Sequence, residues 1–168
     1  AVLTVTASAA PALTVTKTAS QTPLVVGQAG QFYTITVAVA NGPTTAPITF
    51  NDTLPSGITT TPASITATGG TLTGCSSTTS LAGCSIASPT GGPIVITVPV
   101  TVAATAVNPS ANTATATGGG DPLCPAGANC TSTVTTPVID AIDEATTGQP
   151  GQPGTFNVTT NDKYPAGS

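Results

Sequence analysis

Lys17 lies in a sequence context that permits it to act as a nucleophile. It follows Leu13 and Val15 at two-residue intervals, and this alternation puts all three side chains on one face of an expected β-strand. Because that face is apolar, the lysine can be buried, and burial disfavours the charged ammonium relative to the neutral amine. A neutral amine can attack a side-chain amide. The same pattern also fits a lysine whose ammonium reaches solvent at a strand end.

An asparagine would be the acceptor in such a reaction. Asn41 and Asn51 are the candidates, and Asp52, which follows the second of them, could carry the proton between the amine and the leaving group. The sequence therefore offers the hypothesis of an internal isopeptide bond from Lys17 to Asn41 or Asn51, with Asp52 as the proton shuttle.

A second group of oxygen-bearing side chains lies near the carboxyl terminus. Asp140, Asp143 and Glu144 come together, and Asn161 and Asp162 could return to them across an intervening Pro/Gly-rich turn. Calcium needs several oxygen ligands at one point, so a calcium site is the best ligand hypothesis. The alternative is a solvated acidic linker, which the absence of EF-hand spacing favours.

The sequence offers no other set of catalytic groups. It contains no histidine, so neither a Ser-His-Asp nor a Cys-His arrangement can form. The carboxylates fall in expected turns and linkers without a partner base. We therefore expect a non-enzymatic protein, and calcium is the one cofactor that the sequence leaves open.

Four cysteines divide into two local pairs. Cys75 and Cys84 form one pair, Cys124 and Cys130 the other, and neither pair has the spacing of a zinc knuckle. Four cysteines allow three disulfide connectivities. Local pairing is favoured because each pair lies in a Gly/Ser/Pro-rich loop, and disulfides indicate an oxidising, extracellular compartment.

The composition is apolar and almost uncharged. Only 5% of the 168 residues are charged, whereas 39% are hydrophobic, so the chain lacks the composition of a disordered protein. The formal net charge of −4 provides no basic patch for nucleic acid. No apolar run approaches the roughly 18 residues that span a bilayer. A surface with so few charges repels copies of itself weakly, which suits a polymer or a dense surface coat.

Short alternating segments separated by Gly, Pro and Asn predict an all-β protein. The segments expected to be strands are 2–7, 13–18, 33–39, 47–50, 64–68, 93–102, 111–117, 131–138 and 155–159. Pro99 inside the longest segment indicates an edge position or a bulge. Strands at this spacing are typical of an Ig-like Greek-key β-sandwich.

Three segments form a recognisable combination: 13–17, 26–43 and 51–57. They contain a lysine-bearing first strand, a glycine-rich turn before Tyr-Thr-Ile-Thr-Val, then Asn-Gly-Pro, and then Asp-Thr-Leu-Pro. This combination resembles the tandem Ig-like repeat of bacterial and archaeal surface proteins called domain of unknown function 11. The flanking pieces resemble cadherin-like modules of bacterial adhesins. The resemblance implies an Ig-like domain over 11–138.

The ends of the chain then have a separate role. Residues 1–10 would complete a neighbouring sheet, and residues 139–168 would open the next module or be donated to a neighbouring subunit. Isolated strands cannot bury their apolar faces alone, so another copy would cover them. The alternative is that both ends fold back onto their own domain. The expected subunit-contact residues are Val2, Leu3, Val5, Phe156 and Val158.

These features predict a structural subunit or repeat of an extracellular prokaryotic filament or cell-surface fibre. The links would be joined head-to-tail by strand complementation, because a head-to-tail contact that does not close produces a filament. Its partners would be copies of itself or adjacent repeats, with no nucleic acid and no insertion into a membrane. The alternatives are a passive spacer in a covalent giant adhesin and an adhesive module that contacts a sugar or a host protein.

Overall fold

The computed structural model describes residues 8–87 and 92–140, and regular structure there is almost entirely β-strand. The strands are β1 (Ala12–Ala19), β2 (Leu24–Val25), β3 (Phe32–Ala40), β4 (Ile48–Thr53), β5 (Ile58–Thr59), β6 (Thr66–Thr68), β7 (Leu72–Thr73), β8 (Cys84–Ile86), β9 (Ile94–Pro99), β10 (Thr101–Val102), β11 (Ser110–Gly118), β12 (Thr131–Thr136) and β13 (Val138–Ile139). Single-turn 3₁₀ helices, η1 (Pro62–Ser64) and η2 (Ala128–Cys130), interrupt the loops. No helix among the described residues is long and apolar enough to cross a membrane.

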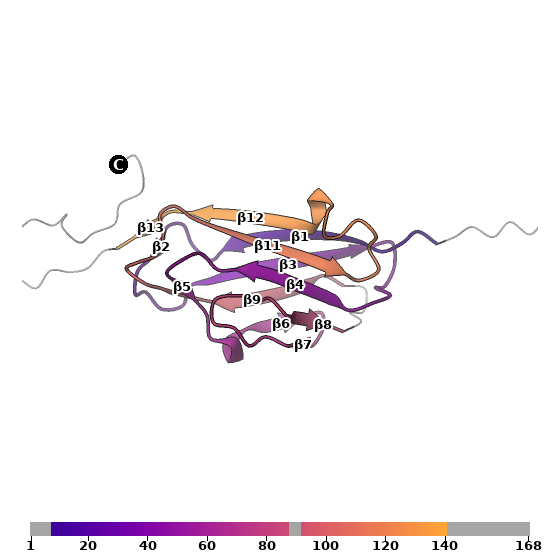
Figure 1. Cartoon of the computed structure of the whole chain (residues 1–168), viewed down its shortest axis with the longest axis horizontal. Helices are drawn as coiled ribbons and strands as arrows, with labels where there is room; N and C mark the ends of the chain where they lie inside the picture. Colours follow the sequence, from indigo (N-terminus) through magenta and orange to yellow (C-terminus); the bar gives the residue numbers. More distant parts are fainter. Residues whose placement is uncertain (1–7, 88–91, 141–168) are drawn as a thin grey trace, which may run out of the picture.

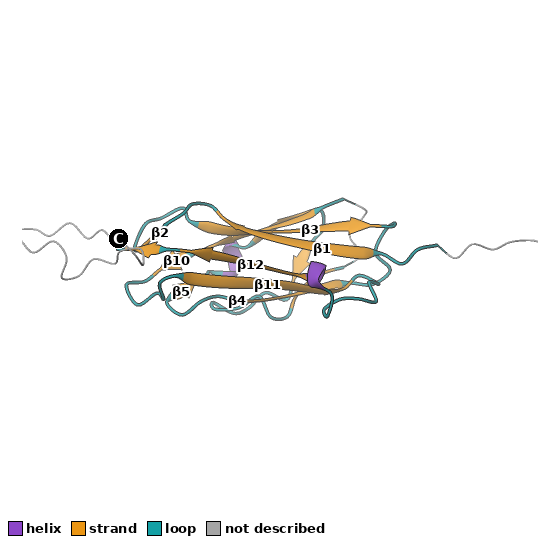
Figure 2. Ribbon diagram, turned by 90° about the horizontal axis from the view of Figure 1, so that it is seen from above, coloured by secondary structure: helices purple, strands orange, loops and turns teal. Residues whose placement is uncertain are grey.

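Two sheets pack face to face in an Ig-like β-sandwich. One sheet has four strands in the order β1-β3-β9-β6, and the other has five in the order β12-β11-β4-β8-β7. Figure 2 shows β1 and β3 in one layer, with β11 and β4 in the other. Two further small sheets, β10-β5 and the parallel pair β13-β2, lie together at one end. The all-β, two-sheet fold expected from the alternating segments is confirmed.

The core is made of branched aliphatic side chains that point inward from both sheets. Along β1, Leu13, Val15 and Lys17 are buried while the residues between them are exposed. Alternation of this kind follows from the pleat, which sends successive side chains to opposite faces. The other fully buried large residues include Leu24, Tyr33, Ile35, Val37, Ile48, Ile58, Leu81, Ile86, Ile94 and Ile96.

Pro99 does not mark an edge strand. β9 lies inside its sheet, paired with β3 on one side and β6 on the other, and Pro99 is its last residue. The chain then leaves this sheet, and β10 pairs with β5. The expected continuous strand over 93–102 is therefore wrong, because a proline cannot donate to a ladder and here it stands where the ladder stops.

The chain enters and leaves the sandwich at opposite ends. The segment before β1 lies at one end of the long axis and β13 lies at the other (Figure 1). The long strands run roughly along this axis, so a pull on the two ends is directed along the strands. The first strand, β1, is also held to the opposite sheet: its Lys17 backbone N–H donates to Ser132 Oγ of β12 at 3.0 Å.

The interior of the four-stranded sheet yields a first prediction. Ile96 is fully buried in β9 between Ile35 and Ala67. Ile96→Ala should lower the free energy of unfolding by about 2–5 kcal/mol, because the side chain loses its contacts and leaves a cavity. Thr97→Ala, one residue along and only half-buried, is the control and should cost less than about 1 kcal/mol. Chemical denaturation measures both, and equal losses would contradict the assigned register.

Candidate functional site

The most distinctive chemical feature of the interior is an ion pair between the two sheets. Lys17 Nζ of β1 donates a hydrogen bond to Asp52 Oδ2 of β4, and both side chains are 0% exposed. β1 belongs to the four-stranded sheet and β4 to the five-stranded one, so the pair bridges the core. Breaking such a pair is costly, because the remaining partner is left as an uncompensated buried charge.

An aromatic ring encloses the lysine from its own sheet. The Lys17 Nζ lies 4.7 Å from the centroid of the Tyr33 ring. Tyr33 is on β3 opposite Ala19, one inward-facing position along from Lys17, and it is fully buried. The π-face of such a ring attracts a cation.

Burial brings the pKa values of Lys17 and Asp52 closer together. Loss of solvent lowers the pKa of Lys17, although attraction by Asp52 opposes that change. Loss of solvent also raises the pKa of Asp52, opposed first by the charge of Lys17, then by its hydrogen bond and by the amide of Asn112. Both changes favour a neutral amine beside a neutral acid, which is the protonation state that nucleophilic attack requires.

Asn112 is the third polar side chain of this cluster. It lies on β11, which pairs with β4 so that Ala114 faces Asp52, and Asn112 is the next inward-facing residue. Asn112 is fully buried, and its amide is near enough to lower the pKa of Asp52. Yet among the described residues neither its Oδ1 nor its Nδ2 completes a hydrogen bond, and Asp52 Oδ1 also lacks a partner. Unpaired buried polar atoms of this kind are rare in folded proteins.

The asparagines expected to accept Lys17 are elsewhere. Asn51 precedes Asp52 on β4, so its side chain is on the outer face of the sheet and is exposed. Asn41 is also exposed, in the turn after β3, with a positive φ of 64°. The geometry therefore contradicts both as acceptors for the buried Lys17, whereas Asp52 is in contact with it as expected.

Asn112 was missed although the sequence carries a signal for it. In Ala-Asn-Thr-Ala-Thr-Ala-Thr, Asn112 falls in step with Ala114 and Ala116, while the threonines occupy the other face. Small apolar residues on one face and hydroxyls on the other indicate which face is buried. An asparagine on the buried face needs partners that only the tertiary structure can supply.

The cysteines form the two local disulfides, Cys75–Cys84 and Cys124–Cys130. Asp121 Oδ2 lies 3.3 Å from Cys124 Sγ of the second disulfide, but both carboxylate oxygens already accept hydrogen bonds from backbone N–H groups. Its Oδ2 accepts the backbone N–H of Leu13 at 2.7 Å, and its Oδ1 accepts that of Leu123 at 2.8 Å. Asp121 therefore anchors the start of β1 to the disulfide loop.

Of the five residues expected to bind calcium, the structure describes only Asp140. This residue is buried, follows β13, and its Oδ1 has no hydrogen-bond partner among the described residues. Asp143, Glu144, Asn161 and Asp162 lie outside the described residues, so the site stays a prediction.

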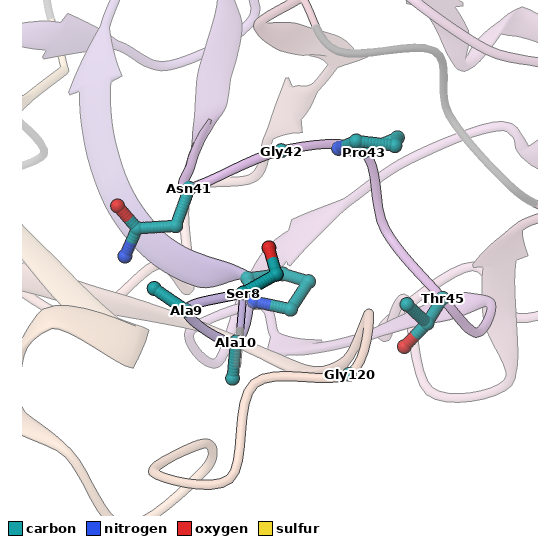
Figure 3. Close-up of a pocket in the computed structure, with 9 residues that line it drawn as sticks. Ser8, Ala9, Ala10, Asn41, Gly42, Pro43, Thr45 and Gly120 are labelled. Atoms are coloured by element: carbon teal, nitrogen blue, oxygen red, sulfur yellow. The ribbon is translucent and has the colours of Figure 1, made fainter. Parts of the chain in front are cut away.

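A groove at the entry end of the sandwich offers little chemistry. It is lined by the segment before β1 and by the turn after β3, with Thr45 and Gly120 at its edge (Figure 3). All of its lining residues are uncharged, and none titrates near neutral pH. The groove brings together no acid, base or nucleophile pair.

No protein-family model matches this sequence, and no curated protein matches it. The resemblance to the tandem Ig-like repeat therefore remains a prediction. Among solved structures the chain is similar to the pilus backbone protein RrgB of Streptococcus pneumoniae, with 15% identity and a TM-score of 0.44 over 63% of this chain and 31% of that one. It is also similar to the T6 backbone pilin of serotype M6 Streptococcus pyogenes, with 11% identity and a TM-score of 0.44 over 75% of this chain and 36% of that one. The chain thus spans about a third of the length of either pilin chain.

Replacing the buried lysine gives a second prediction. Lys17→Met keeps an apolar stem but leaves the buried Asp52 carboxyl without its partner, so the free energy of unfolding at neutral pH should fall by about 3 kcal/mol or more. Lys163→Met, which removes the chain's other lysine, is the control and should change the stability little.

The same variant should become more stable in acid. Without Lys17, burial raises the pKa of Asp52 with no opposing cation, above the ordinary 3.8 of the unfolded chain. At a pH between the pKa of Asp52 in the unfolded chain and its higher pKa in the folded chain, the folded state binds more protons than the unfolded state. Stability is therefore retained at low pH and lost as the pH rises through the folded pKa. Denaturant titrations at a series of pH values measure this slope. A flat profile would show that the Asp52 carboxyl is not enclosed.

Proposed function

We propose that this chain is a structural link of an extracellular fibre, joined head-to-tail to copies of itself or to adjacent repeats. The observation that carries the proposal is the placement of the segment before β1 and of β13 at opposite ends of the sandwich (Figure 1). Links arranged in this way transmit tension through each module along its long strands. The groove in Figure 3 is lined by uncharged residues.

The disulfides and the pairing of β1 with β3 support a load-bearing role. The two disulfides close loops of the sandwich, and covalent loop closure restricts the unfolded chain. β1 pairs with β3 over its whole length, from Ala12–Ala40 to Ala19–Tyr33, so a pull along β1 acts on many hydrogen bonds at once. Disulfides also fit an oxidising compartment, such as the cell exterior.

Strand complementation is the proposed linkage. The apolar segments that would make it, containing Val2, Leu3 and Val5 at the head and Phe156 and Val158 at the tail, lie outside the described residues. Each is too short to bury its apolar face alone. A tail strand added to a sheet of the next subunit would satisfy both the backbone and the apolar side chains.

Charged substitutions in the full-length chain test this linkage. Val2→Asp/Val5→Asp alters the head and Phe156→Asp/Val158→Asp alters the tail, and the described sandwich is untouched by both. The unaltered chain should form concentration-dependent assemblies in light scattering and filaments in electron microscopy. Each altered chain alone should stay monomeric, whereas a mixture of the two should form dimers, because one intact head can accept one intact tail.

Two results would overturn the proposal. A monodisperse monomer at every concentration of the unaltered chain would mean a passive spacer or an adhesive module. Filaments that both altered chains still form would mean a fibre held by other surfaces, which would reject strand complementation. Denaturing electrophoresis of the assemblies separates non-covalent links, which give a 16.0 kDa band, from covalent ones.

A further inference from the structure

We propose that Lys17 and Asn112 become joined by an isopeptide bond between Lys17 Nζ and Asn112 Cγ, with Asp52 as the acid–base group. The proposal goes beyond the structural role inferred above and does not depend on it. It rests on the arrangement of three buried side chains from three strands.

The register of the strands brings the three groups to one place. Lys17 reaches across from β1 and contacts Asp52 on β4. β4 and β11 are hydrogen-bonded neighbours, and the inward-facing position diagonally next to Asp52 is Asn112. Diagonal neighbours on one face of an antiparallel pair are within reach of long side chains. The lysine amine, the carboxyl and the amide therefore share one enclosed site between the sheets.

Three polar atoms of this site are buried without a hydrogen-bond partner among the described residues, so no competing hydrogen bond ties them up. They are Asn112 Oδ1, Asn112 Nδ2 and Asp52 Oδ1. A buried amide without partners is costly. Formation of the isopeptide bond removes the Asn112 amino group altogether and leaves a carbonyl oxygen that the protonated Asp52 carboxyl can donate to.

The reaction needs no reagent from outside the site. A proton moves from the Lys17 ammonium to Asp52, and the amine lone pair then attacks Asn112 Cγ while the Asp52 carboxyl protonates the carbonyl oxygen. The lysine nitrogen of the tetrahedral species loses a proton, which Asp52 transfers to Asn112 Nδ2. The bond from Cγ to Nδ2 then breaks, and the carbonyl reforms as its oxygen returns a proton to Asp52. Ammonia departs, Asp52 ends as a neutral carboxyl, and no oxidant or reductant is consumed.

The surroundings favour each step. Desolvation lowers the pKa of Lys17 and raises that of Asp52, so the first proton transfer is easier than in water. The amine lies over the Tyr33 ring, and the Lys17 and Asp52 side chains are 0% exposed, so water does not surround the reacting groups. The backbone holds amine and amide together, which converts a slow bimolecular reaction into an intramolecular one.

Mass spectrometry of the intact, full-length chain tests the proposal. After reduction of both disulfides, the folded protein should be lighter than its sequence by the mass of one ammonia molecule. Digestion with pepsin should yield a branched peptide that joins the segment containing Lys17 to the segment containing Asn112. Full sequence mass together with an unlinked Lys17 peptide would overturn the proposal.

Variants identify the groups that take part. Lys17→Arg removes the nucleophile, Asn112→Leu removes the leaving group and Asp52→Asn removes the acid, so each should retain full sequence mass. The branched peptide from the unaltered chain decides the question independently of whether these variants fold.

Matched controls exclude other losses of ammonia. Asn41 precedes a glycine and can cyclise to a succinimide with the same change in mass, and Asn51 is the exposed neighbour of Asp52. Asn41→Ala and Asn51→Ala should both keep the branched peptide. Disappearance of the mass change in Asn41→Ala, or a branch at any other residue, would contradict the assignment.

Discussion

A lysine enclosed between two β-sheets constrains everything packed around it. The Lys17 ammonium has left water, so the site must supply a counter-charge, and Asp52 supplies it from the facing sheet. This requirement fixes how β1 sits over β4, since any slip by one residue would turn Lys17 to the outer face. The surrounding aliphatic core provides the low polarity that makes the pair unusual, and the Lys17 nitrogen lies over the Tyr33 ring.

The same three strands would connect the chemistry to the proposed load-bearing role. β1 is the strand by which the chain enters the sandwich, whereas β11 precedes β12 and β13, by which it leaves (Figure 1). A covalent bond from Lys17 on β1 to Asn112 on β11 would therefore lie on the path of a load between the two ends. The load could then cross from sheet to sheet without separating the core. The disulfides, by contrast, close local loops that lie beside that path.

Short-range alternation predicted much of the fold. The burial of Leu13, Val15 and Lys17 on one face follows directly from their spacing, as does the all-β class. Alternation also implied that Asn51 and Asp52 face opposite ways, which argues against Asn51 as an acceptor for a buried lysine. The pairing of β4 with β11 could not be predicted. Pairing between strands far apart in the chain depends on tertiary packing rather than on local spacing. Pro99 was misread for a related reason: a proline shows that a ladder stops, but not whether the strand before it is central.

The chemical state of the Lys17 side-chain nitrogen tests the account most directly. The chain has only two lysines, Lys17 and Lys163, and no arginine. Labelling lysine with ¹⁵N therefore gives two side-chain signals in a nuclear magnetic resonance spectrum, and Lys163→Arg assigns them. The account predicts that the Lys17 nitrogen appears as an amide with one slowly exchanging hydrogen. An ammonium signal that exchanges rapidly with solvent at Lys17 would contradict it, because the lysine would then be neither enclosed nor bonded to Asn112.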